Sequence, residues 1–178
     1  AGARQSYEHA IKLDPTFAAA YFRVSIVHWM LNNLRERDEA IKKARELSLK
    51  ATERERLCIE AEYALDIENN RQKSIRILEE TIKKYPQDKA AHYRLGLTYD
   101  YVGLHDQALE EYNKVLSLDP GYPDALNSAG YEYFVLRDFE KAVEYLKRYA
   151  SVLPGKPNPL DSLADIYFRI GKLDEAIE

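Results

Sequence analysis

Residues 89–122 read KAAHYRLGLTYDYVGLHDQALEEYNKVLSLDPGY, and residues 123–156 return to the same pattern as PDALNSAGYEYFVLRDFEKAVEYLKRYASVLPGK. A proline recurs at a constant spacing of 34 residues, as Pro86, Pro120 and Pro154. An alanine recurs at the same spacing, as Ala108, Ala142 and Ala176. Self-similarity at this period is typical of a repeat array, in which each unit packs only against its neighbours.

Aligned on these prolines, the 178 residues divide into successive units of one continuous domain. We expect a partial unit over residues 1–17, full units over 55–88, 89–122 and 123–156, and a truncated unit over 157–178. The unit over 18–54 is three residues longer, and we expect its extra turn around Trp29 to Asp38, since Ala40 restores the register. Both ends of the chain fall inside a unit, so we expect a fragment of a longer array.

Each half of a unit carries an apolar stripe with helical spacing, for example Leu95, Tyr99 and Val102. Small residues such as Ala108 and Gly130 would let the two helices of a unit approach closely. Asn69, Gly103 and Gly171 lie where the first helix of a unit should end, and such residues supply the left-handed conformation found there. The sequence therefore predicts two helices in each unit.

The pattern resembles the tetratricopeptide repeat family over essentially the whole chain. Its marks are a small residue at position 8 of the unit, Tyr at 11, Ala at 20, an aromatic residue or Leu at 24 and Pro at 32. In the unit over 89–122 these are Gly96, Tyr99, Ala108, Tyr112 and Pro120. The resemblance implies an all-α fold, a right-handed superhelical solenoid of stacked antiparallel helix pairs that binds other proteins.

Composition excludes several other functions. The net charge is −4 and the acidic excess lies in residues 89–178, whereas a nucleic-acid-binding protein needs a basic stripe. Among helical-hairpin repeat families, the pentatricopeptide arrays are the nearest relatives of this pattern that bind RNA. The 34-residue period and its recurring proline favour the tetratricopeptide assignment instead. No run of 18 apolar residues is present, so we expect no transmembrane helix and no membrane partner. A single cysteine fits a reducing compartment, and we expect a cytoplasmic location.

Few residues indicate chemistry. Cys58 falls at a core position and is expected to be a small buried hydrophobe. His28 occupies a position that Tyr or Leu fills in other units, so we expect it to be packed, and none of the four histidines has a recurring metal-ligand spacing. No glycine-rich phosphate loop is present. We therefore expect no enzyme activity, no catalytic residues, no cofactor and no metal site.

The resemblance also implies where a ligand would bind. In this family the first helix of each unit lines a concave surface, with positions 2, 5, 9 and 12 facing the ligand. The candidate binding residues that follow from this are Phe22, Ile26, Trp29, Ile59, Tyr63, Tyr93, Leu97, Asp100, Asp124, Asn127, Tyr131, Phe134, Asp161, Asp165 and Phe168. They are aromatic and apolar at first and acidic toward the C-terminal end. The alternative interpretation is that some of the aromatic residues only fill gaps between neighbouring helices.

Two binding modes of the family are not matched. A clamp for acidic C-terminal tails needs Lys and Asn at positions 5 and 9, where one unit has Ile59 and Tyr63. An asparagine ladder at position 6 is replaced by residues such as Arg23 and Glu60.

The expected function is therefore a protein–protein interaction module that binds a peptide or helix of a partner in its concave groove. The ligand would have apolar anchors and a basic end. The module would belong to a larger protein, because Thr52–Ala61 is similar to arrays attached to bacterial signalling proteins. The alternative is a homotypic assembly element that self-associates weakly through exposed repeat ends or through the concave face.

Overall fold

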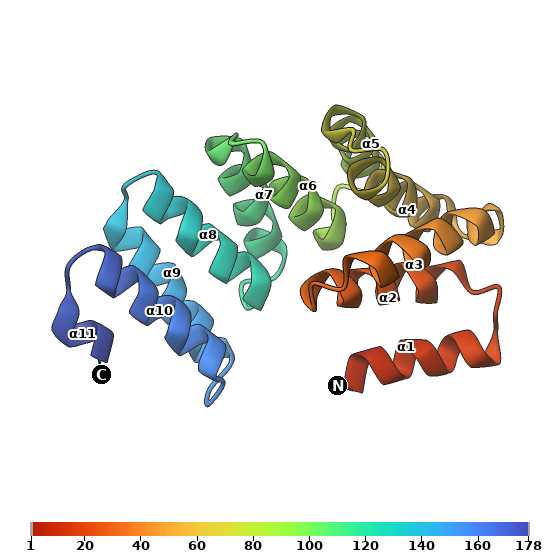
Figure 1. The fold of residues 1–178 in the computed structure, drawn as a ribbon. Helices are drawn as coiled ribbons and strands as arrows, with labels where there is room; N and C mark the ends of the chain where they lie inside the picture. The colour runs from red at the N-terminus through yellow and green to blue at the C-terminus, as the bar shows by residue number, and fades with distance from the viewer. Residues whose placement is uncertain (1, 178) are drawn as a thin grey trace. The chain divides into compact units, whose positions relative to one another are not determined.

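The computed structural model describes residues 2–177, without the side chains of Gly2, Ala3, Glu175 and Ile177. Over this range the chain is helical and contains no strand, which confirms the all-α prediction (Figure 1). The helices are α1 (Gly2–Leu13), α2 (Ala18–Met30), α3 (Leu34–Leu47), the 3-10 helix η1 (Ser48–Lys50), α4 (Glu53–Asp66), α5 (Arg71–Lys84), α6 (Lys89–Tyr101), α7 (His105–Leu118), α8 (Pro123–Val135), α9 (Phe139–Val152), α10 (Pro157–Arg169) and α11 (Leu173–Ile177). The outermost residues of the two terminal predicted units, 1 and 178, lie outside the described range.

The chain divides into two compact units, Ala1–Pro86 and Gln87–Glu178. In the first unit α2 packs against α3, and α4 packs against α5. In the second unit α6 packs against α7, α8 against α9, and α10 against α11 (Figure 1). Each pair is a helical hairpin with a short turn, as the sequence predicted.

Each turn inside a hairpin contains one residue in the left-handed conformation. The positive φ angles are 50° at Asn69, 77° at Gly103 and 81° at Gly171, which confirms the three predicted helix ends. The following residue closes the turn: the Leu104 N–H, for example, donates a hydrogen bond to the Tyr99 carbonyl oxygen at 2.9 Å. Arg137 has a φ of 64° at the equivalent place, where a residue other than glycine is uncommon.

The three extra residues of the predicted unit 18–54 lie later than the sequence indicated. The left-handed residues of the turns inside the hairpins recur every 34 residues except at the start, where Asn69 follows Asn32 (φ 56°) after 37 residues. Helix α3 begins two residues after Asn32 and has 14 residues, like α5, α7 and α9. The expected position around Trp29 to Asp38 is therefore wrong. One extra residue lies in the connection between α3 and α4, which has five residues instead of four. One lies in α4, which has 14 residues where α2, α6, α8 and α10 have 13, and one lies in the turn between α4 and α5.

Small residues allow close helix contacts in the second unit. A Cβ atom built on Gly130 of α8 would lie 2.8 Å from Leu146 Cγ of α9, closer than real Cβ contacts. One built on Gly96 of α6 would lie 2.5 Å from Cε1 of Tyr112 in α7. Ala108 is fully buried in the same core. These contacts confirm the predicted close approach of paired helices.

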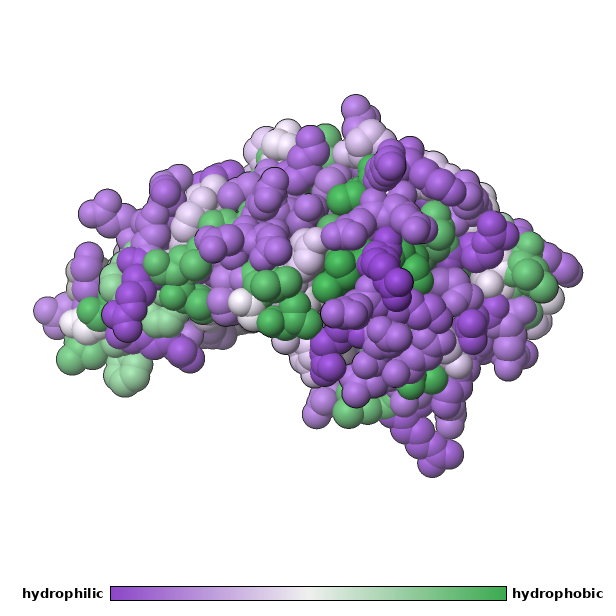
Figure 2. All heavy atoms as spheres, turned by 90° about the horizontal axis from the view of Figure 1, so that it is seen from above, coloured by the Kyte–Doolittle hydropathy of each residue, from purple (hydrophilic) through white to green (hydrophobic). Residues whose placement is uncertain are grey.

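The first unit has its own hydrophobic core between α2, α3 and α4. It includes Ile41, Ala44 and Cys58, and His28 is buried on α2. The predicted packing of Cys58 and His28 is therefore confirmed. None of the described helices has the length and hydrophobicity needed to cross a membrane. Hydrophilic side chains cover most of the face seen in Figure 2, with smaller hydrophobic patches among them.

Candidate peptide-binding surface

Five of the predicted binding residues lie on α2 and α4 of the first unit. Phe22 and Ile59 have only 6% and 0% of their surface exposed and belong to the hydrophobic core. Ile26 and Tyr63 are half-buried and pack against that core. Trp29 is 52% exposed near the end of α2. Phe22 and Ile59 are thus core residues, and only the other three present surface to a ligand.

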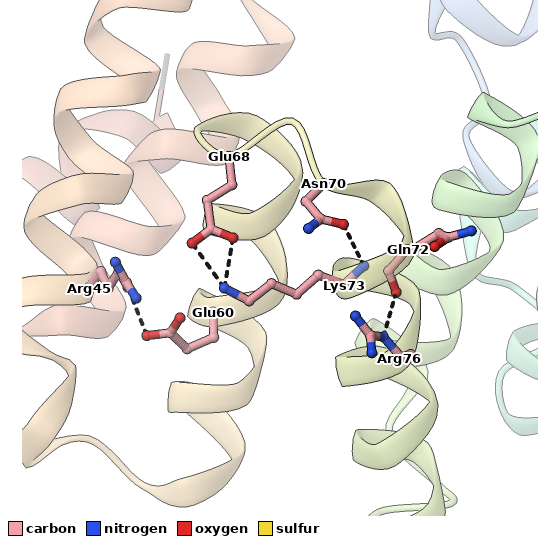
Figure 3. A network of polar contacts seen from close by, with 7 residues as sticks. All are labelled: Arg45, Glu60, Glu68, Asn70, Gln72, Lys73 and Arg76. Carbon is pink, nitrogen blue, oxygen red and sulfur yellow. Dashed lines mark hydrogen bonds and ion pairs between the residues drawn. The ribbon is translucent and has the colours of Figure 1, made fainter.

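One of these three residues, Tyr63, has a cation over its ring. The guanidinium carbon of Arg45 lies 4.1 Å from the ring centroid, and Arg45 Nε donates a hydrogen bond to Glu60 Oε1 at 2.9 Å. Figure 3 shows Arg45 and Glu60 pointing toward one another, and it also shows an ion pair between Lys73 and Glu68. In this second pair Lys73 Nζ lies 2.7 Å from Glu68 Oε2. The pair of Arg45 and Glu60 joins α3 to α4. In the first unit, Glu60 therefore holds the guanidinium group of Arg45 over the ring of Tyr63.

The end of α2 also exposes apolar side chains that the repeat positions did not reveal. Met30, Leu31 and Leu34 are exposed next to Trp29 in the sequence, around the turn between α2 and α3. Contiguous exposed apolar side chains often mark interaction sites. Their signal in the sequence is the run Trp-Met-Leu directly before the left-handed Asn32.

In the second unit the first helices of successive repeats are joined by side-chain contacts. The hydroxyl groups of Tyr93 on α6 and Ser128 on α8 lie 3.3 Å apart. The hydroxyl of Tyr131 on α8 donates a hydrogen bond to Oδ2 of Asp165 on α10 at 3.3 Å. The second contact joins two predicted binding residues of neighbouring repeats, whereas Ser128 in the first contact was not predicted.

Three predicted residues come together between α8 and α10, and a fourth that was not predicted joins them. Arg169 Nε donates a hydrogen bond to Asp165 Oδ1 at 2.9 Å. The guanidinium carbon of Arg169 lies 5.8 Å from the centroid of the Phe134 ring. We call Tyr131, Phe134, Asp165 and Arg169 the α8–α10 cluster. Arg169 could have been found from the sequence as the partner of Asp165 four residues earlier on one helix.

The other predicted residues of this unit differ in their surroundings. Leu97 packs against the core, whereas Asp161 and Phe168 are exposed on α10. Asn127 is half-buried on α8, and its Oδ1 atom is buried with no hydrogen-bond partner within the described range. Asp124 is exposed as a residue, although its carboxyl group is partly covered.

Burial shifts the acidity of several of these groups. It raises the pKa of Tyr93 to about 12, and it also raises the pKa values of Tyr131 and Asp124. Tyr93 and Tyr131 are therefore neutral at physiological pH. Their hydroxyl groups can donate and accept hydrogen bonds.

Asp100 has neighbours that the sequence pattern did not indicate. His105 Nδ1 lies 2.9 Å from Glu132 Oε2 and 3.9 Å from Asp100 Oδ1. Burial and the charge of Asp100 raise the pKa of Glu132 to about 7. No spacing within one helix could have revealed this group, because its three residues come from α6, α7 and α8.

Comparison with known proteins agrees with this architecture. Residues 90–122 match the family model of the tetratricopeptide repeat. No curated protein matches the chain.

Among solved structures, the crystal structure of MamA is 27% identical over 87% of this chain and 89% of its own, with a TM-score of 0.56. YrrB, described as a TPR protein with an unusual peptide-binding site, is 23% identical over 89% and 80%, with a TM-score of 0.57. TTC0263, a thermophilic TPR protein of Thermus thermophilus, is 19% identical over 89% and 86%, with a TM-score of 0.72. Residues 90–122 are thus a tetratricopeptide repeat, and the chain has the fold of tetratricopeptide-repeat proteins, which serve as protein-interaction modules.

Proposed function

We propose that this protein binds a peptide or a helix of a partner protein through the first helices of its repeats. The observation that carries the proposal is the α8–α10 cluster, which places two aromatic rings and a carboxylate side by side on two neighbouring repeats. YrrB, a similar fold, is described as having a peptide-binding site, and this supports the same use of the fold here.

The cluster suits a basic side chain of the ligand. Asp165 offers a carboxylate, Phe134 offers a ring face, and Asp161 adds a second negative charge one turn earlier on α10. A lysine or arginine gains from both the ion pair and the cation–π contact. Arg169 already makes both contacts, so a basic residue of the ligand would have to displace it. The proposed ligand therefore competes with a resident arginine.

An apolar anchor of the ligand would be received by an exposed ring. Phe168 is exposed on α10, the helix that also carries Asp165 and Arg169. Aromatic side chains of this kind are frequent anchors in protein interfaces. The buried residues Phe22 and Ile59 have no part in the proposed surface.

The test is the variant Arg169→Gln, which removes the resident cation and leaves Asp165 and Phe134 in place. A peptide array is first screened with the unaltered protein at two salt concentrations, and fluorescence anisotropy then measures the selected peptides. We expect peptides with a Lys or Arg to bind the variant more tightly, and the Asp165→Asn variant more weakly.

The matched control is Arg148→Gln. Arg148 also lies over an aromatic ring, with its guanidinium carbon 4.8 Å from the centroid of Tyr145, but it belongs to α9, a second helix of a repeat. This change should leave binding unaltered. A preference for acidic peptides, or equal affinities of the unaltered protein and Arg169→Gln, would show that the α8–α10 cluster does not receive a basic side chain.

A second candidate function is weak self-association. The observation that favours it is the exposed apolar group of Trp29, Met30, Leu31 and Leu34, which a second copy of the chain could cover. Sedimentation at increasing protein concentration distinguishes the two functions. The sedimenting mass of a peptide-binding module stays constant as the protein concentration rises, whereas that of an assembly element increases. In an assembly element, the Trp29→Ala variant should no longer show this increase.

A further inference from the structure

Three potential metal ligands converge in the second unit, away from the α8–α10 cluster. Asp100 lies near the end of α6, His105 begins α7, and Glu132 lies on α8 of the next repeat. The tight turn at Gly103, with its φ of 77°, returns the chain so that His105 faces the end of α6. One nitrogen and two carboxylate oxygens of these residues all lie within 4.8 Å of one another.

The separations fit one small cation. Zn²⁺ binds His nitrogen and carboxylate oxygen at about 2.0–2.2 Å, so tetrahedral ligand atoms lie roughly 3–4 Å apart. His105 Nδ1 lies 2.9 Å from Glu132 Oε2 and 3.9 Å from Asp100 Oδ1. Small side-chain rotations would bring all three atoms to bonding distance of a shared ion. An imidazole beside carboxylates favours first-row transition metals over Mg²⁺ or Ca²⁺.

Two carboxyl groups lie side by side at this place. Glu132 is only 3% exposed, and Asp100 adds a second carboxyl group beside it. A buried carboxylate is unfavourable unless a positive charge compensates it or it takes up a proton. A divalent cation would compensate both carboxylates, whereas His105 provides at most one positive charge.

Tyr112 packs against the helix that carries Asp100. Its ring lies on Gly96, one turn before Asp100, and its buried hydroxyl makes no hydrogen bond of standard geometry among the described residues. Burial raises the pKa of Tyr112, and the charges of Asp100 and Glu132 raise it further, whereas Ser128 lowers it.

The same group is open on one side. The side chains of Asp100 and His105 are partly exposed, whereas Glu132 is buried behind them. An ion could therefore enter from solvent and keep a water molecule as a further ligand.

We propose that Asp100, His105 and Glu132 form a binding site for a first-row divalent cation, with Zn²⁺ as the ion tested first. The ion would connect the hairpin of α6 and α7 to α8 of the next repeat. Its effect would be to stabilise the stacking of two repeats, and it would neutralise the two carboxylates near Leu97, which lies on the same helix as Asp100.

The experiment uses the whole protein after treatment with a chelator. Isothermal titration with Zn²⁺ should give one ion per chain with micromolar affinity, and Co²⁺ should give visible absorption bands of a protein-bound ion. Zn²⁺ should also raise the unfolding temperature. The variants His105→Ala and Asp100→Asn should weaken binding by more than the about 10–100-fold that loss of an outer-shell partner costs.

Asp100 is exposed, so its variant should remain folded, and circular dichroism checks this for each protein. The matched control is His9→Ala, an exposed histidine on α1. This variant should bind Zn²⁺ as tightly as the unaltered protein. The proposal is overturned if the unaltered protein binds Zn²⁺ only at millimolar concentration, if His105→Ala keeps full affinity, or if His9→Ala loses it.

Discussion

The hydroxyl of Tyr131 donates a hydrogen bond to the carboxylate of Asp165 at 3.3 Å, and these two residues are one repeat of 34 residues apart. The contact joins α8 to α10, the first helices of two successive hairpins. In a repeat array each unit is stabilised by its neighbours. A single polar contact of this kind therefore contributes both to the stacking of repeats and to the surface that a ligand would meet.

The exposed charges of α10 should act on binding in a salt-dependent way. In Asp161→Lys, the affinity for a selected basic peptide should fall several-fold at low salt and little at high salt, because charges farther apart than about 10 Å are screened at 0.1 M. Phe134→Ala should weaken the same peptide at both salt concentrations. Fluorescence anisotropy measures both variants, and an equal loss for Asp161→Lys at high salt would contradict the expectation.

The contact at Gly130 should not tolerate a larger side chain. Gly130→Leu is expected to destabilise the protein by about 1–3 kcal/mol through overpacking against Leu146 of α9. The control is Gly121→Leu, because a Cβ atom there would meet no atom closer than 3.8 Å. Urea unfolding compares the two variants. An unchanged midpoint for Gly130→Leu would argue against this helix contact.

Two substitutions at left-handed turn residues, Arg137 and Gly103, should change the stability of the protein in opposite directions. Arg137→Gly should stabilise the protein by up to about 1 kcal/mol, since the left-handed conformation costs about 1–2 kcal/mol for a residue other than glycine. The greater flexibility of glycine in the unfolded chain reduces this gain by about 0.4–1 kcal/mol. Gly103→Ala should have the opposite sign and act through the backbone alone, because its Cβ would meet no atom within 4 Å. Denaturant unfolding tests both, and changes of the same sign would refute this account.

Ionised Glu53 in the first unit should stabilise the folded protein, and this stabilisation should be lost at acidic pH. Its carboxylate accepts hydrogen bonds from Lys84 at 2.6 Å and from Tyr85 at 3.2 Å, and the bond from Lys84 is the main cause that lowers the pKa of Glu53. A lowered folded-state pKa means that the contribution is present above the unfolded value and is lost as the pH falls through the folded one.

Glu53→Gln should therefore reduce stability slightly at neutral pH and should approach the unaltered protein below about pH 4, where free carboxylates become protonated. The effect will be small because the pair is exposed. Thermal unfolding at neutral and acidic pH measures it. A difference that grows toward acidic pH would have the wrong sign.

The unpartnered hydroxyl of Tyr112 predicts an unusual response to its removal. In the metal-free protein, Tyr112→Phe should be neutral or stabilising, because a buried hydroxyl without a partner costs about 1–3 kcal/mol. Tyr149→Phe is the control, since the Tyr149 hydroxyl accepts a hydrogen bond from Asn158 at 2.7 Å and its loss should destabilise. Unfolding in urea with a chelator present measures both variants. Clear destabilisation by Tyr112→Phe would show that the hydroxyl has a favourable partner.

The sequence by itself determined the helical hairpins and their period. Asn69, Gly103 and Gly171 could be read as helix ends because left-handed backbone is a local property of the residue type. The same holds for the small residue at Gly130, since the spacing along one helix places it toward its partner. Such features depend on neighbouring residues in the chain, so a single sequence contains them.

Only the tertiary structure decided which of the predicted binding residues are available. Phe22 and Trp29 lie on one helix with similar side chains, yet one is buried and the other exposed, because α3 and α4 cover only part of α2. Likewise, Asp100, His105 and Glu132 meet through the packing of three helices. Burial and contacts between helices depend on how the hairpins stack, and this is set by all the side chains between them rather than by the spacing of a motif.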